Sequence, residues 1–337
     1  MGDDMDIKRT TIDDFEKIDI MTDDGGRFSL LSLGATVYDW TTPSGVNIVA
    51  AYEKFDDYKK PGMYLGTTVG PNAGRIQNGS FTIGGERYQT EEKDSNFLHS
   101  GKEGLSFKVF EVKRCEITQE DTIVVFSLDY IHSVLPGRQT FTVTYRIRDR
   151  RMSIEYEATS DKETIINLTN HCYFNLNGTF DQPIDDHALT TEASRVTTVD
   201  EELLAKDIMH VEGSLLDFRT KRFLKDAYEA PELNNHPVGG VDHFFLFDED
   251  DKKEAVLFAE NSNRKLTVSF TMPGLTVYTS NTPKDNLLKS GTPLLKHGAV
   301  CLEPEYNPNA VNDERFEVSI AKKGQSYHET IVYELEE

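Results

Sequence analysis

The residues of this chain best suited to proton-transfer chemistry are a histidine and a carboxylate that each lie within a strand-like pattern. Glu303 ends an apolar run in "GAVCLEPEYNPNAVND" (298–313), and the following Pro304 biases Glu303 toward extended backbone. A carboxylate held at the end of an apolar strand by a rigid turn is a candidate general base. The alternative interpretation is a strand-edge glutamate that faces water.

A polar row without charges accompanies the histidine in "NLTNHCYFNLNG" (167–178). In extended chain the side chains alternate between two faces, which predicts an apolar face interrupted only by Asn170. The opposite face would carry Asn167, Thr169, His171, Tyr173 and Asn175. Since each unpaired buried polar group costs about 1–3 kcal/mol, this row predicts either an internal network or the lining of a cleft for a polar ligand. His171 is the member able to exchange a proton near neutral pH.

Three further segments hold polar residues among turn formers or aromatics. They are Arg75 in "GPNAGRIQNG" (70–79), His99 in "NFLHSGKEG" (96–104) and Asp242 in "GGVDHFFLF" (239–247). Each also fits ordinary loop chemistry. No histidine pair has the HxH or HExxH spacing of metal ligands, and "GTTVGPNAG" (66–74) does not match the dinucleotide fingerprint GxGxxG. We therefore expect neither a metal nor a cofactor.

The composition favours a protein that handles small neutral molecules. Lys and Arg total 36 against 58 Asp and Glu, a formal net charge of −22, which argues against nucleic acid or an anionic membrane as a partner. No apolar run approaches the ~20 residues of a membrane span, and the first residues lack a signal-like apolar stretch. The three cysteines, Cys115, Cys172 and Cys301, form no CxxC pair. We expect a cytoplasmic protein with free thiols.

Alternating apolar and polar residues dominate the chain and predict an all-β fold, a large antiparallel β-sandwich with few short helices. Examples are "RQTFTVTYRIRD" (138–149), "MSIEYEA" (152–158), the pair 254–260 and 265–272, and a hairpin through Gly84-Gly85. The only helical patterns are 200–207 and 220–229. Because no linker is evident, we interpret residues 1–337 as one domain. Two β domains divided near 160–180 are the alternative.

Taken together and in order, these segments resemble the aldose 1-epimerases, or galactose mutarotases. The resemblance spans most of the chain and rests most strongly on "TNHCYFNLNG". The matching segments are "AGRIQNG" (73–79), "FLHSGKEG" (97–104), "LTNHCYFNLNG" (168–178), "VDHFFLF" (241–247), "VYTSN" (277–281) and "LEPEYNPNAVN" (302–312).

The resemblance implies a large β-sandwich enzyme that opens and recloses the ring of a free aldohexose such as galactose or glucose. It implies His171 as general acid and Glu303 as general base, with no cofactor or metal. It also implies that Arg75, His99 and Asp242 bind sugar hydroxyls and that Tyr173 lines the same site. The partner would be an aldose sugar, and the protein a monomer or a homodimer.

Several positions that contact substrate in the family differ here, and they leave the preferred sugar open. The differing residues are Pro71, Gly74, Ser100, Thr276, Glu305 and Asn309. Three other functions remain as alternatives: a sugar-binding or sensing protein without catalysis, an epimerase acting on another or a phosphorylated aldose, and a glycoside hydrolase. The hydrolase would use Asp242 and Glu303 as its two carboxyl groups, about 5–5.5 or 6.5–9.5 Å apart.

Overall fold

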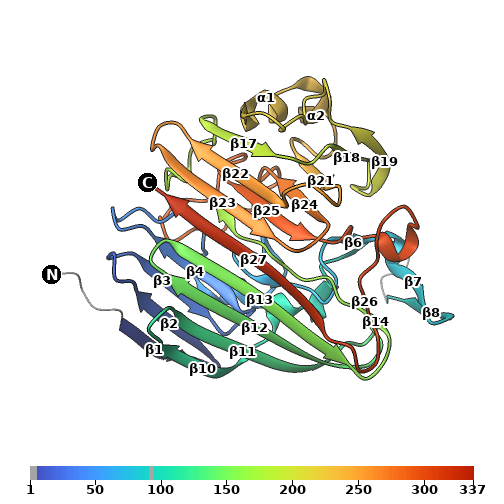
Figure 1. Cartoon of the computed structure of the whole chain (residues 1–337), viewed down its shortest axis with the longest axis horizontal. Helices are drawn as coiled ribbons and strands as arrows, with labels where there is room; N and C mark the ends of the chain where they lie inside the picture. Colours follow the sequence, from blue (N-terminus) through green and yellow to red (C-terminus); the bar gives the residue numbers. More distant parts are fainter. Residues whose placement is uncertain (1–5, 91–94) are drawn as a thin grey trace.

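Two large antiparallel sheets and one smaller sheet make up the structure, a computed structural model that describes residues 6–90 and 95–337 (Figure 1). The nine-stranded sheet has the order β10 (Glu111–Ile117), β11 (Thr122–Ile131), β12 (Arg138–Arg148), β13 (Arg151–Ser160), β27 (Tyr327–Glu336), β23 (Arg264–Phe270), β22 (Glu254–Ala259), β17 (His187–Thr191), β20 (Arg222–Phe223). The six-stranded sheet has the order β16 (Tyr173–Phe174), β25 (Val300–Glu305), β24 (Gly274–Tyr278), β21 (Asp242–Leu246), β18 (Arg195–Val199), β19 (Ala205–His210). The four-stranded sheet runs β1 (Asp6–Ile12), β2 (Phe15–Met21), β3 (Arg27–Leu31), β4 (Thr36–Thr41).

Short strand pairs connect these sheets and support the loops between them. They are β5 (Thr68–Val69) with β15 (Thr169–Asn170), β6 (Arg75–Ile76) with β9 (Phe97–Leu98), β7 (Ser80–Ile83) with β8 (Glu86–Gln89), and β14 (Thr164–Ile165) with β26 (Ile320–Ala321). The β7–β8 hairpin turns at Gly84 and Gly85, whose φ angles are +59° and +84°. The predicted hairpin is thus confirmed, with glycines where positive φ is required.

The alternation in the sequence produces a two-faced sheet. In β12 the inward row Phe141, Val143, Tyr145 and Ile147 is fully buried. This strand pairs antiparallel with β13, and the predicted pair β22–β23 forms as well. The mostly β architecture with galactose mutarotase-like neighbours confirms the predicted fold class.

A single tryptophan joins the three larger sheets in the core. Trp40 of β4 lies edge-on to Phe174 of β16 and to Tyr333 of β27, with ring centroids 6.4 Å apart in each case. Apolar side chains from all three sheets form one continuous buried cluster around it. The interpretation of the chain as one domain stays a prediction.

Helical structure is sparse in the described part of the chain. The α-helices α1 (Leu224–Tyr228) and α2 (Pro231–Asn234) lie together at one edge of the molecule (Figure 1). The 3₁₀ turns are η1 (Phe55–Lys59), η2 (Gln77–Gly79), η3 (Gly101–Glu103), η4 (Leu105–Phe107) and η5 (Ala310–Asn312). None of the described helices has the length and apolar character needed to cross a membrane.

One helix prediction is wrong. Residues 200–207 form a turn followed by β19, because the Asp200 carboxylate accepts hydrogen bonds from the backbone N–H groups of Glu202 and Leu204. A side chain that bonds nearby backbone in this way competes with helix formation. The prediction at 220–229 is confirmed in part, since α1 occupies its second half.

Candidate active site

β25 carries two glutamates on the face that borders a cavity of the protein. Glu303 and Glu305 are two positions apart, so both side chains point the same way, and both are buried and line the cavity. β25 is held between β24, where Thr276 stands opposite Glu303, and β16, where Tyr173 stands opposite Cys301. The strand therefore has a hydrogen-bonded neighbour on each side in the six-stranded sheet, which fixes the position of its side chains.

The segment that carries His171 is an interrupted strand, not the continuous one the sequence predicts. β15 pairs with β5, whereas β16 pairs with β25, and His171 lies in the gap between them. Its backbone N–H donates to Thr67 O (3.0 Å) and its carbonyl accepts from Gly66 N (2.9 Å). The chain changes partner at this point, which directs the imidazole into the cavity across from Glu303.

The uncharged polar row divides into structural members and cavity members. The Asn167 side chain bonds the backbone of Tyr306 in both directions, each at 3.0 Å. The Asn175 amide donates to Thr179 O and Gly298 O at 2.9 Å. The Thr169 hydroxyl is buried without a partner and lies outside the cavity. Both interpretations of the row thus hold in part: Asn167 and Asn175 belong to an internal network, whereas His171 and Tyr173 line the cavity.

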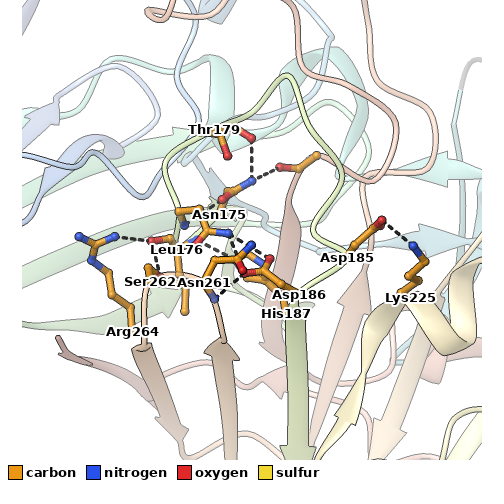
Figure 2. Close-up of polar contacts among 12 residues, drawn as sticks. Asn175, Leu176, Thr179, Asp185, Asp186, His187, Lys225, Asn261, Ser262 and Arg264 are labelled. Atoms are coloured by element: carbon orange, nitrogen blue, oxygen red, sulfur yellow. Dashed lines mark hydrogen bonds and ion pairs between the residues drawn. The ribbon is translucent and has the colours of Figure 1, made fainter.

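A second polar network holds the loop that follows β16 (Figure 2). The Asn177 amide donates to both Asp186 carboxylate oxygens (3.0 and 2.9 Å), and His187 Nδ1 contacts Asp186 Oδ1 at 2.9 Å. The Leu176 N–H donates to His187 Nε2, so the His187 proton is on Nδ1 and points to Asp186. The Arg264 guanidinium donates to Leu176 O at 2.9 Å. These bonds fix the chain a few residues beyond His171.

His171 and Glu303 form the centre of the cavity. His171 Nε2 lies 3.6 Å from Glu303 Oε2, and both side chains are more than nine-tenths buried. The imidazole is stacked on Tyr173 (centroids 5.1 Å apart) and on Tyr64 (6.1 Å). The two rings hold the plane of the imidazole, so the approach of Nε2 to the carboxylate is geometrically defined.

Arg75, Asp242 and His99 lie at the same cavity. Arg75 Nη1 is 3.9 Å from Asp242 Oδ2. His99 Nδ1 accepts from the backbone N–H of Gly74 (3.0 Å), which places the His99 proton on Nε2, and the His99 and His171 rings meet edge to face at 5.5 Å. Gly74 has φ +69°, and a Cβ there would lie 2.1 Å from Pro308. Glycine is thus required at this departure from the family pattern.

All six residues singled out from the sequence line this one cavity of about 290 Å³. They are Arg75, His99, His171, Tyr173, Asp242 and Glu303. The volume is at the small end of the range for ligand pockets. The structure thus brings together residues from five separate segments of the chain.

Comparison with known proteins decides the family. The family profile described as Aldose 1-epimerase matches residues 16–334. The chain belongs to the aldose 1-epimerase family. These proteins are isomerases that act on carbohydrates, and this chain is one of them.

Two curated relatives of the epimerase support the assignment. The galactose mutarotase of Mus musculus is 32% identical over 289 residues, covering 84% of this chain and 82% of the relative. The aldose 1-epimerase of Escherichia coli (strain K12) is 32% identical over 263 residues, covering 76% and 74%. The crystal structure of galactose 1-epimerase from Lactobacillus acidophilus NCFM has the same fold, with a TM-score of 0.86, 24% identity, and 99% and 98% coverage.

Burial sets the protonation of the groups in the epimerase cavity. It lowers the pKa of His171 to about 4, and, together with nearby His171 and Arg75, holds the pKa of His99 well below its usual range. Burial also raises the pKa of Asp242 and of Glu303, for which the neighbouring Glu305 adds to the effect. The cavity therefore favours the neutral form of each of these groups.

The cavity of the epimerase also contains residues that the sequence did not single out as site residues. Tyr64 and Tyr278 form part of its wall. Tyr64 has φ +55°, a strained value for an aromatic residue, but its segment "GMYLG" (62–66) carries no pattern that indicates a site. Thr276 and Glu305, noted only as departures from the family pattern, line the cavity as well.

One group of metal-ligand types lies at the centre of the cavity. Ligand atoms of His171, Cys301 and Glu303 lie within 4.8 Å of one another. Burial raises the pKa of the Cys301 thiol well above its usual range, and a metal ligand must be a thiolate. Burial thus favours the neutral thiol, which is not the form that binds a metal.

Proposed function

We propose that this epimerase interconverts the α and β anomers of a free, neutral aldohexose such as galactose or glucose. The observation that carries the proposal is the 3.6 Å approach of His171 Nε2 to Glu303 Oε2 inside a small cavity. The names of the relatives, a galactose mutarotase and an aldose 1-epimerase, support the same substrate class. We propose His171 and Glu303 as the catalytic pair.

Ring opening requires two proton transfers. Glu303 accepts the proton of the C1 hydroxyl while protonated His171 donates the proton on Nε2 to the ring oxygen. The C1–O5 bond breaks and the C1 aldehyde forms. Rotation about C1–C2 then presents the other face of the carbonyl, and ring closure reverses both transfers. General acid–base assistance of this kind is worth about 10²–10⁴-fold.

During ring opening His171 loses one proton and Glu303 gains one. The closed sugar requires imidazolium with carboxylate, and the open sugar leaves neutral imidazole with carboxylic acid. Burial lowers the pKa of His171 and raises that of Glu303, which favours the neutral pair. The cavity therefore stabilises the protonation state that accompanies the open-chain sugar, and it disfavours by the same amount the imidazolium–carboxylate pair from which ring opening starts.

The remaining residues of the site would position the sugar. Arg75, with its guanidinium directed toward Asp242, and His99, with its proton on Nε2, present hydrogen-bond donors to sugar hydroxyls. Asp242 presents an acceptor. Tyr173 forms an apolar wall beside His171. Such neutral and charge-assisted partners suit a substrate made mostly of hydroxyl groups.

Optical rotation of freshly dissolved pure anomers tests this proposal. The panel is galactose, glucose, xylose, arabinose, maltose and a phosphorylated hexose, each compared with its spontaneous rate. We expect acceleration with at least one neutral aldohexose. Rates equal to the spontaneous ones across the panel, with sugar binding detected by calorimetry, would instead support a sensing protein. Release of reducing sugar from a glycoside would support a hydrolase.

A further inference from the structure

The catalytic carboxylate of the proposed mutarotase has a second buried carboxyl beside it, that of Glu305. Glu303 and Glu305 point to the same cavity from one strand, with exposed fractions of 4% and 2%. Glu305 Oε1 accepts a 2.5 Å hydrogen bond from the Thr276 hydroxyl on the neighbouring β24. The mechanism above does not use Glu305.

The charge of Arg75 acts on this pair of carboxyls from a distance and lowers the pKa of both. Within residues 6–90 and 95–337, no lysine or arginine forms an ion pair with either glutamate, and the Arg75 guanidinium is directed to Asp242. The titratable and charged groups that surround the pair from other elements are Arg75, His171, Tyr173, Asp242, Tyr278 and Tyr333. Four of these six, Asp242 and the three tyrosines, add only negative charge when ionised.

Two neighbouring carboxylates in a buried site cannot both ionise at low cost, so they titrate as a pair. Burial raises the pKa of both Glu303 and Glu305; for Glu303 the charge of Glu305 is the next cause. The Thr276 hydroxyl acts in the opposite direction, because its hydrogen bond stabilises the ionised form of Glu305. Glu305 is thus the member of the pair that is equipped to carry the negative charge first.

We infer that Glu305 is a positioning residue that acts through Glu303: the two carboxyls share one proton, and the charge of Glu305 sets the pH at which Glu303 can accept the C1-hydroxyl proton. This inference rests on the proposed function. Below that pH Glu303 keeps its proton and ring opening stops. The charge of Glu305 also makes Glu303 a stronger base once it has ionised. Thr276 contributes by stabilising the charge on Glu305.

The test is the pH dependence of kcat/KM, measured by polarimetry on the full chain for the wild type and Glu305→Gln. Glutamine keeps the shape and removes the charge, so the midpoint of the acid limb is expected to move down by about one pH unit or more. Thr276→Val is expected to move it in the same direction by less, since Glu305 then holds its proton more firmly.

Glu329→Gln is the matched control. Glu329 is also buried and accepts a hydrogen bond from a threonine hydroxyl, that of Thr271, but it lies outside the cavity. The midpoint of the acid limb of kcat/KM for Glu329→Gln should equal that of the wild type. A change in KM alone for Glu305→Gln, with the midpoint unmoved, overturns the inference and leaves Glu305 as a sugar-binding residue. If Glu305→Gln does not fold, an unmoved midpoint in Thr276→Val overturns it. Activity retained by Glu303→Gln would instead overturn the proposed function.

Discussion

Asn167 and the backbone of Tyr306 exchange two hydrogen bonds of 3.0 Å, one in each direction. At the other end of β25, the Asn175 amide donates to Gly298 O at 2.9 Å. The segment that carries His171 is therefore fastened to both ends of the strand that carries Glu303. This explains why amides flank the histidine: they hold the imidazole and the carboxylate in register, 3.6 Å apart.

The first prediction concerns this fastening. Asn175→Ala removes three hydrogen bonds: the carbonyls of Thr179 and Gly298 lose these donors and the Asn177 N–H loses this acceptor, at a cost of about 1–3 kcal/mol in unfolding free energy. We expect kcat to fall more than KM changes, because the distance between acid and base is altered. Urea unfolding and polarimetry measure the two effects.

Asn177→Ala is the control for Asn175→Ala. Its amide bonds Asp186 in the adjoining network (Figure 2) and does not contact β25. It should lower stability while leaving kcat close to that of the wild type. Equal losses of kcat in the two variants would mean that general loosening of the loop, and not the link to β25, affects the reaction.

The second prediction concerns the proposed acid. His171→Asn keeps a polar, though smaller, side chain that supplies no titratable proton. We expect kcat to fall by about 10²–10⁴-fold while sugar binding, measured by calorimetry, changes little. A large loss of binding with little change in kcat would assign His171 to substrate recognition alone.

The third prediction concerns stability in acid. Burial first, and His236 next, lower the pKa of His243 to about 4. Between pH 6.5 and 4 the unfolded chain binds a proton at this position and the folded protein does not, so stability falls as the pH is lowered through this range. The contribution of this one group is about 3 kcal/mol across the range.

His243→Asn tests this pH dependence. The Asn side-chain oxygen can accept the hydrogen bond that Asp242 N–H now donates to His243 Nδ1. Unfolding free energies measured with urea should decline less steeply from pH 6.5 to 4 in this variant than in the wild type. Parallel declines would show that His243 is not held neutral in the folded state.

The fourth prediction concerns anionic sugars. Asp242, Glu303 and Glu305 line the cavity, and Arg75 faces Asp242. A phosphate group brought into this site meets carboxyls and little free positive charge, so we expect kcat/KM for a hexose 6-phosphate to be at least about 10²-fold below that for the free hexose, a penalty of about 3 kcal/mol. Comparable values would indicate that the phosphate remains in solvent.

The sequence was sufficient to predict the strands whose two faces differ in polarity and six of the residues that line the cavity. Alternation in β12 and β13 reports directly which face is buried. The break at His171 was not predictable, because the residues around it keep the alternation of a strand. Asn167 and Asn175 nevertheless bond distant backbone, and Thr169 pairs with Val69 of β5. Asn167 finds its partner at Tyr306, and no local pattern encodes a contact of that sequence separation.

Two other features lay beyond sequence reasoning for related reasons. The turn at 200–204 depends on the Asp200 carboxylate bonding nearby backbone, which outweighs a helical pattern of only two turns. The placement of Tyr64 depends on a backbone with a φ of +55°, which no residue pattern in its segment indicates. In both cases the outcome is set by hydrogen bonds or packing that the residue pattern does not record.

The most direct test of the central claim is the mutarotation rate of Glu303→Gln, followed by the optical rotation of freshly dissolved α-galactose and α-glucose near neutral pH. Glutamine preserves shape and hydrogen bonding but cannot accept the C1-hydroxyl proton. The account predicts a rate lower by about 10²–10⁴-fold than that of the wild type, with unchanged circular dichroism. A rate within a few-fold of the wild type, in a folded variant, would contradict it.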